Sequence, residues 1–227
     1  MSQVQPAGED DLALTGYLPW DAVESGLRAV TLLVDRTQRP YAEATIELKR
    51  YAVEDLSPIA TYVLRPQLEL LGRVQTQLVD RYALNLFDVA GMLEYELGGV
   101  AHRLITPVVE RFYEPTQDRV VSVIVDGLHR VCLARRLDVT HIWVTEISEV
   151  PARFPIVSLP LRWEQVREVD SVPTDAAKRE FRYASIDDVP AELTTVGLTP
   201  ENYRYYFYRD LSGLGSGGVR RSADVTT

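Results

Sequence analysis

The stretch PVVERFYEPTQDRVVSVIVDGLHRVCLARRLDVTHIWVTEI, residues 107–147, decides the fold. Its runs of β-branched residues favour extended backbone, and the polar residues between the first two runs are typical of a hairpin. Apolar residues then recur at helical spacing over 128–137, which predicts a helix. The predicted strands are Ile105–Phe112, Arg119–Val125 and His141–Ile147. Strand, hairpin, strand, helix and strand in this order indicate an α+β fold.

The dipeptide Asp126-Gly127 ends the second strand and leads directly into the helix. Backbone N–H groups at a helix start lack intrahelical acceptors, and the helix dipole adds positive charge, so this turn favours a bound anion. Asp126 can cap the helix or hold Mg²⁺ through its oxygens. His129 and Arg130 add two cationic side chains in the first turn, and Arg130 can grip phosphate oxygens with its planar fork. The alternative is an ordinary Asp-Gly turn followed by a solvated His-Arg pair.

The same stretch resembles the ParB/sulfiredoxin-like superfamily over roughly residues 104–147. That core has a strand beginning with Pro-Val, a hairpin, a hydrophobic strand ending in Asp-Gly-x-His-Arg, a helix and a closing strand. The resemblance implies a small mixed sheet with helices, and phosphate contacts at Gly127, His129 and Arg130. The candidate binding site also takes in Asp126 and Leu128 of the same turn. The implied cofactors are a nucleoside phosphate (ATP, ADP or CTP) and Mg²⁺, with Asp126 as the metal ligand.

Three branches of this superfamily can be compared with the residues. Sulfiredoxin carries a catalytic cysteine where this chain has Leu128, and we interpret the single cysteine, Cys132, as a small core residue. Chromosome-partitioning ParB proteins continue into a helix-turn-helix, but prolines and acidic residues follow Ile147 here. A formal net charge of -9 also argues against a nucleic-acid partner. Nucleotide-dependent free-serine kinases fit better.

The preferred hypothesis is therefore phosphoryl transfer to a small hydroxylated metabolite, with serine as the first substrate to test. Such chemistry needs a carboxylate base, for which Glu110 and Glu69 are the candidates. For each of them a solvated surface carboxylate is the more common outcome. The rival hypothesis is a non-catalytic or nucleotide-switched module that contacts DNA or another protein. An exposed basic groove lined by Arg135, Arg136, Arg204 and Arg209 would favour this rival.

The rest of the chain divides around that core. We expect a β-rich extension over 1–49, the nucleotide-binding core over 50–150, a Pro- and aromatic-rich extension over 151–212 and a flexible tail over 213–227. Strands are predicted near 27–35 and 42–51, and helices over 66–81 and 84–97, the second of which Gly98-Gly99 would end. Short helices are expected over 163–169 and 175–183. The aromatic residues of 203–209 should pack on the core with their arginines exposed.

Composition limits the remaining possibilities. Hydrophobic residues make up 46% of the chain, which is ordinary for a globular protein. No run approaches the roughly 18 to 20 apolar residues of a membrane span, and the acidic N-terminus does not look like a secretory signal. We therefore expect a cytoplasmic protein whose partners are a nucleotide and a small molecule. If Arg130 is exposed, replacing it with alanine should barely affect stability.

Overall fold

The computed structural model describes residues 11–194 and 197–214 of the chain. The predicted tail over 213–227 lies outside the described residues except for its first two. Helices and strands are mixed throughout, so the predicted α+β class is confirmed. The helices are α1 Trp20–Arg28, α2 Arg65–Tyr82, α3 Leu128–Arg136, α4 Asp175–Lys178 and α5 Ala191–Thr194. The strands are β1 Leu12–Pro19, β2 Thr31–Leu32, β3 Thr45–Ala52, β4 Leu56–Ser57, β5 Tyr62–Leu64, β6 Gly91–Leu97, β7 Val100–Ile105, β8 Val108–Glu114, β9 Arg119–Asp126, β10 His141–Ser148, β11 Arg167–Val169 and β12 Arg209–Asp210.

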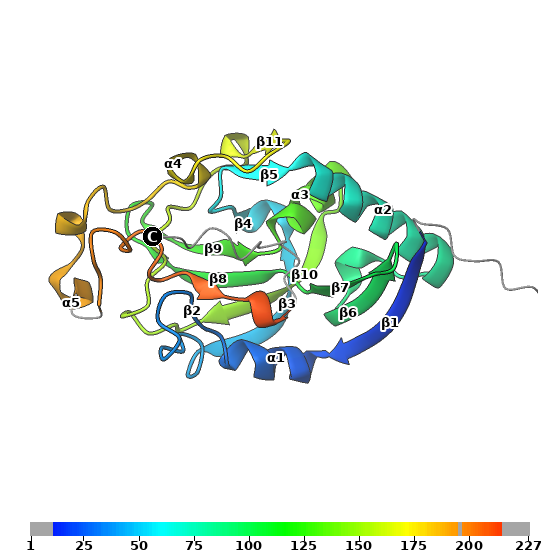
Figure 1. Cartoon of the computed structure of the whole chain (residues 1–227), viewed down its shortest axis with the longest axis horizontal. Helices are drawn as coiled ribbons and strands as arrows, with labels where there is room; N and C mark the ends of the chain where they lie inside the picture. The colour runs from blue at the N-terminus through cyan, green and yellow to red at the C-terminus, as the bar shows by residue number, and fades with distance from the viewer. Residues whose placement is uncertain (1–10, 195–196, 215–227) are drawn as a thin grey trace, which may run out of the picture.

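A five-stranded sheet with the order β3-β10-β8-β9-β4 forms the centre of the molecule (Figure 1). The β8 and β9 strands form the predicted antiparallel hairpin, and β10 returns beside β8 in the parallel direction after α3. The middle of β9 is buried on both faces, as its nearly continuous Val/Ile run predicts. This sheet places the end of β9, and with it the Asp126-Gly127 turn, over the middle of the molecule.

One face of the sheet packs against α2 and α3. Leu68, Val74 and Leu78 of α2 are buried there, as the helical spacing of its apolar residues predicts. A second sheet with the order β1-β6-β7 closes the same core from the side. Even α2, an 18-residue helix, is not sufficiently apolar to cross a bilayer, and the other helices in the described ranges do not qualify either.

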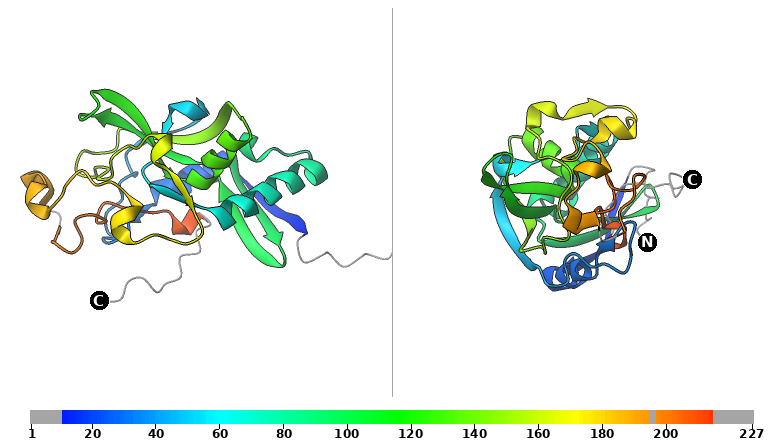
Figure 2. Two further views of the ribbon diagram at one scale, coloured as in Figure 1. Left: turned by 90° about the horizontal axis from the view of Figure 1, so that it is seen from above. Right: turned by 90° about the vertical axis from the view of Figure 1, so that its left-hand side faces the viewer.

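The other face carries α1 and the C-terminal segment. Val23 and Leu27 of α1 pack with Ile147 of β10 and Leu211, which follows β12. The β12 strand pairs with β2, so the last described residues lie beside the N-terminal part of the chain (Figure 2). The two ends of the described chain therefore build this face together.

Two buried ion pairs attach the C-terminal segment to β8. Arg209 donates to both carboxylate oxygens of Glu110, at 2.8 and 3.0 Å, and the hydroxyl of Tyr41 donates to the same carboxylate. Four residues along β8, Glu114 accepts from Arg182 at 2.9 and 2.5 Å. Arg209 was expected to be exposed, and this was wrong: its side chain is 1% exposed. A buried carboxylate needs a paired cation, which the arginine supplies.

The predicted helix over 84–97 is wrong. Residues Leu86–Asp88 form one 3-10 turn, and Gly91–Leu97 is strand β6, which pairs with β7. Gly98 and Gly99 have φ of 59° and 74°, so they form the tight turn of a β-hairpin instead of ending a helix. The apolar residues of 91–97 fit either period over so short a stretch, and pairing with β1 and β7 selects the strand.

Several predicted boundaries in the extensions change as well. The strand expected over 27–35 shrinks to β2, because α1 occupies the chain up to Arg28. The strand expected over 42–51 is β3, and the helix expected over 66–81 is α2, so both are confirmed. Residues 163–169 form a 3-10 turn and β11, and only Asp175–Lys178 of the expected helix over 175–183 is helical.

Candidate functional site

Gly127 forms the turn between β9 and α3. Its φ of 87° lies in the left-handed region, where residues with a Cβ are strained. A Cβ at this position would also come within 3.0 Å of the Cα and Cβ atoms of Pro107. The carbonyl of Gly127 accepts from the N–H groups of Arg130 and Val131, so the helix begins at once. Glycine is therefore required here by backbone conformation and by packing, whether or not a ligand binds.

His129 is held by the backbone of a neighbouring element. Its Nε2 accepts a hydrogen bond of 2.8 Å from the N–H of Leu64, the residue that precedes α2. Burial lowers the pKa of His129 to about 4, so the ring is neutral at pH 7 with its proton on Nδ1. The expectation of a cationic His129 was wrong. Instead, the ring ties α3 to the start of α2.

Arg130 is buried, with 5% of its surface exposed, so the condition under which its replacement would barely affect stability is not met. Its Nε and Nη1 atoms are buried and have no hydrogen-bond partner among the described residues. Burial lowers the pKa of Arg130 to about 10, although Asp126 and Tyr95 act in the opposite direction. Tyr95 belongs to β6, so the guanidinium lies between α3 and the three-stranded sheet. A buried cation with unused donors is rare, because desolvation strongly penalises it.

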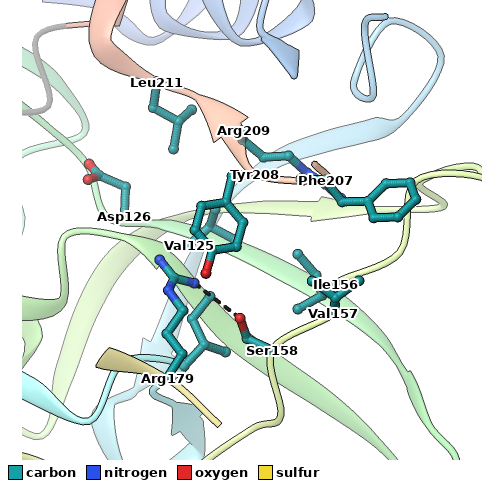
Figure 3. Close-up of a pocket in the computed structure, with 11 residues that line it drawn as sticks. Val125, Asp126, Ile156, Val157, Ser158, Arg179, Phe207, Tyr208, Arg209 and Leu211 are labelled. Atoms are coloured by element: carbon teal, nitrogen blue, oxygen red, sulfur yellow. Dashed lines mark hydrogen bonds between the residues drawn. The ribbon is translucent and has the colours of Figure 1, made fainter. Parts of the chain in front are cut away.

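The other residues of the predicted site have different surroundings. Leu128 is half-buried and packs on the main hydrophobic core, which gives its side chain an apolar role. Asp126 is half-buried and lines a pocket that residues of the C-terminal segment also line (Figure 3). Among the described residues no group of three or more His, Cys, Asp or Glu side chains could hold a metal ion.

The two predicted carboxylate bases lie away from the buried guanidinium. Glu110 is held on the other face of the sheet by Arg209 and Tyr41. Glu69 is exposed on α2, in a shallow groove whose lining residues belong to α2 alone. The structure brings Asp126, Gly127, His129 and Arg130 together in one turn, but it does not bring Glu110 or Glu69 to that turn.

The four arginines that would form a basic groove are engaged separately. Arg209 is buried in its ion pair, and Arg136 pairs with Glu168. Arg135 lies 4.5 Å over the ring of Trp163, and Arg204 lies 5.4 Å over that of Phe181. Since Arg209 is inaccessible and the others contact different elements, these residues do not line one exposed groove.

A pocket beside the turn was missed by sequence reasoning. It combines Val125 and Asp126 of β9 with residues from three later segments, among them Ser158, Arg179 and Tyr208 (Figure 3). The adjacent Lys178-Arg179 pair looks like part of an ordinary charged helix in the sequence. No local signal joins positions so far apart along the chain.

The arrangement of sheet, turn and helix can now be compared with known proteins. A model of the family described as ParB CE domain matches residues 22–168. The chain belongs to this family. Comparisons with curated proteins and with solved structures gave no match. The match supports the ParB/sulfiredoxin-like assignment. The ParB CE domain includes the central sheet, α2, α3 and the turn, but Arg179, Arg182 and β12 lie beyond the matched range.

Proposed function

We propose that this protein binds the phosphate groups of a nucleotide at the turn between β9 and α3. The observation that carries the proposal is the buried guanidinium of Arg130, whose Nε and Nη1 have no acceptor among the described residues. Each of these two donors can form a charge-assisted hydrogen bond to a phosphate oxygen. A phosphate would therefore supply the acceptors that the protein does not.

Two features of the turn support the same ligand. The N–H groups at the start of α3 and the helix dipole favour an anion beside Gly127. His129 is neutral, so it is not a competing cation and can stay bound to Leu64. Because Arg130 is 5% exposed, a ligand reaches it only if α3 and β6 separate slightly, a local change that many proteins make on binding.

A nucleoside phosphate such as ATP, ADP or CTP fits this proposal. Mg²⁺ usually takes one or two protein carboxylates and completes its shell with phosphate oxygens and water. Asp126 is the carboxylate of the turn, so it is the residue that would add Mg²⁺ to a bound nucleotide. That metal would neutralise phosphate charge.

Phosphoryl transfer to a small hydroxylated metabolite such as serine is the finer form of the proposal. The placement of Glu110 and Glu69 does not support it, because Glu110 would first have to leave Arg209 and Tyr41. Nucleotide binding without an assigned base is the function that the geometry supports best. A nucleotide-switched contact with a partner protein is compatible with the same site, whereas the separated arginines do not favour DNA.

The test is calorimetry with ATP, ADP, CTP and GTP in the presence of Mg²⁺. We compare the wild type with Arg130→Met, and use Arg135→Met on the exposed face of the same helix as control. Wild type and control should bind at least one nucleotide saturably. Arg130→Met should lose about 1.5–3 kcal/mol of binding free energy, the range for hydrogen bonds to charged groups. If a folded Arg130→Met bound the nucleotide with the same affinity as the wild type, the turn would not be the phosphate site.

A second assay addresses transfer. Full-length protein is incubated with γ-labelled ATP, Mg²⁺ and serine, and labelled product is compared in wild type, Glu110→Gln and Glu69→Gln. Product that disappears in Arg130→Met but persists in both glutamate variants would establish transfer and exclude these two bases. Saturable nucleotide binding without product would establish the binding function alone.

A further inference from the structure

A pocket lies between the end of β9, residues 156–158 and the segments that carry Arg179 and Tyr208 (Figure 3). Its volume is about 70 Å³, which by the usual measure holds roughly five water molecules. It is lined by Ile59, Val125, Asp126, Ile156, Val157, Ser158, Arg179, Phe207, Tyr208, Arg209 and Leu211. The space suits a ligand of a few heavy atoms and is too small for a nucleotide.

One end of the pocket is polar. Figure 3 shows the guanidinium of Arg179 and the hydroxyls of Ser158 and Tyr208 converging there. Nη1 of Arg179 donates to the Oγ of Ser158 at 3.4 Å, and its guanidinium lies 4.4 Å from the centre of the Tyr208 ring. A bond of 3.4 Å is long, so the serine oxygen is only weakly engaged by it. A cation beside two hydroxyls is the donor set that an oxyanion requires.

Backbone hydrogen bonds hold the three segments that carry these groups. Around Ser158, Leu159 donates to Glu180 and Arg182 donates to Val157, both at 2.8 Å, which pairs the Ser158 and Arg179 segments. The carbonyl of Tyr208 accepts from Leu33 at 2.7 Å. Ser158 itself is 2% exposed. The polar end is therefore built before any ligand arrives, which lowers the ordering cost of binding.

The rest of the wall is largely apolar and includes one carboxylate. Ile59 and Val157 are buried, Val125 and Ile156 are half-buried, and together they would cover a short hydrocarbon chain. Asp126 also lines the pocket, and its negative charge disfavours a doubly charged phosphate more than a singly charged carboxylate. We infer that this pocket binds a small aliphatic carboxylate, with its oxygens on Arg179, Ser158 and Tyr208.

This ligand would lie next to the proposed nucleotide site, because Asp126 belongs to both. The carboxylate does not need the nucleotide, since none of its three polar contacts comes from the turn. The two sites can therefore be tested separately. Arg130→Met should lose nucleotide binding and keep carboxylate binding, whereas Arg179→Gln should do the opposite.

The experiment is a titration of ¹⁵N-labelled full-length protein with sodium propionate, followed by backbone amide shifts at constant ionic strength with sodium chloride as reference. Sodium phosphate tests the inorganic anion, and 1-propanol tests the hydrocarbon part alone. Mg²⁺ is left out so that Asp126 is not shared. Propionate should give saturable shifts at Val125, Ser158 and Tyr208, and the two comparison ligands should bind at least about tenfold more weakly.

Three variants decide the assignment. Arg179→Gln should weaken propionate binding about tenfold or more, and Tyr208→Phe should weaken it by a smaller factor because the ring stays. Arg204→Gln, at an exposed arginine that also stacks on aromatic rings, should bind like wild type. Unchanged affinity in both Arg179→Gln and Tyr208→Phe would overturn the proposal. Tighter binding of phosphate, or equal binding of 1-propanol, would overturn the carboxylate assignment.

Discussion

Replacing Arg130 with methionine should stabilise the protein in the absence of ligand. The guanidinium is buried, and its Nε and Nη1 have no acceptor among the described residues. Methionine has a similar length and helix propensity, and it fills a core without polar atoms. The substitution therefore removes a desolvated cation and keeps most of the packing volume.

The magnitude follows from the pKa of this arginine. Burial lowers it from the ordinary arginine value to about 10, a difference worth about 3 kcal/mol at 1.36 kcal/mol per pKa unit. Because the folded protein disfavours the charged form, this destabilisation is fully present below pH 10 and declines as the pH rises above about 10 toward the ordinary pKa of arginine. Arg130→Met also loses the attraction between Arg130 and Asp126. We therefore expect a net gain of about 1–3 kcal/mol in unfolding free energy at pH 7, within the range for replacing buried ionic groups.

Urea unfolding followed by circular dichroism measures this difference, with nucleotide absent. The control is Arg135→Met, which loses only a stacking contact with Trp163 and should cost at most about 1 kcal/mol. A loss of 2 kcal/mol or more in Arg130→Met, on the order of an ordinary core defect, would refute the reasoning. It would mean that the guanidinium makes stabilising contacts in the free protein, and Arg130 would then need no phosphate to supply its acceptors.

The other predictions concern buried ionisable groups. Arg209→Met should destabilise the fold by about 3–5 kcal/mol because Glu110 is left buried without its cation, and Arg209→Met/Glu110→Leu should recover most of this in denaturant unfolding. Burial raises the pKa of Glu114, but the hydrogen bonds from Arg182 outweigh this effect and hold the pKa at about 2. The ionised Glu114 should therefore stabilise the fold above pH 4.5, and this stabilisation should be lost as the pH falls toward 2. A pH series of unfolding free energies for wild type and Glu114→Gln checks this, since their difference should shrink over that window. Burial lowers the pKa of His129 to about 4, so the neutral ring should contribute stability above pH 6.5 that is lost as the pH falls toward 4. The unfolding free energy of His129→Gln should change less with pH over this window.

The central part of the fold could be predicted because local patterns and tertiary pairing agree there. The Val/Ile run of 119–125 and the hairpin before it are β9 and β8, and the Asp-Gly turn begins α3 where expected. Residues 84–97 could not be assigned correctly, because a short apolar run fits a helix or a strand and only pairing with distant β1 decides. The resemblance to the ParB/sulfiredoxin-like superfamily was strongest over these same residues, where local patterns and tertiary pairing agree.

Only part of the candidate site could be predicted from the sequence, for a different reason. Sequence spacing shows that His129 and Arg130 start a helix, but not which way each side chain points. The orientation depends on partners distant in sequence, namely Leu64 for the histidine and Tyr95 for the arginine. The pocket of Arg179 and Ser158 gave no signal, because its parts come together only through long-range packing.

The C-terminal segment, the described residues after 168, packs on the ParB CE domain and stabilises it, although the family match ends at residue 168. Two of its arginines pair with buried glutamates of β8, so this segment neutralises two buried carboxylates of the domain. Removing it would leave those charges unpaired in the interior, which costs several kcal/mol each. The same segment carries Arg179 and Tyr208 to Asp126. Whatever binds in that pocket is thus recognised in part by side chains outside the family match, and specificity should change with this segment while the turn of Arg130 stays the same.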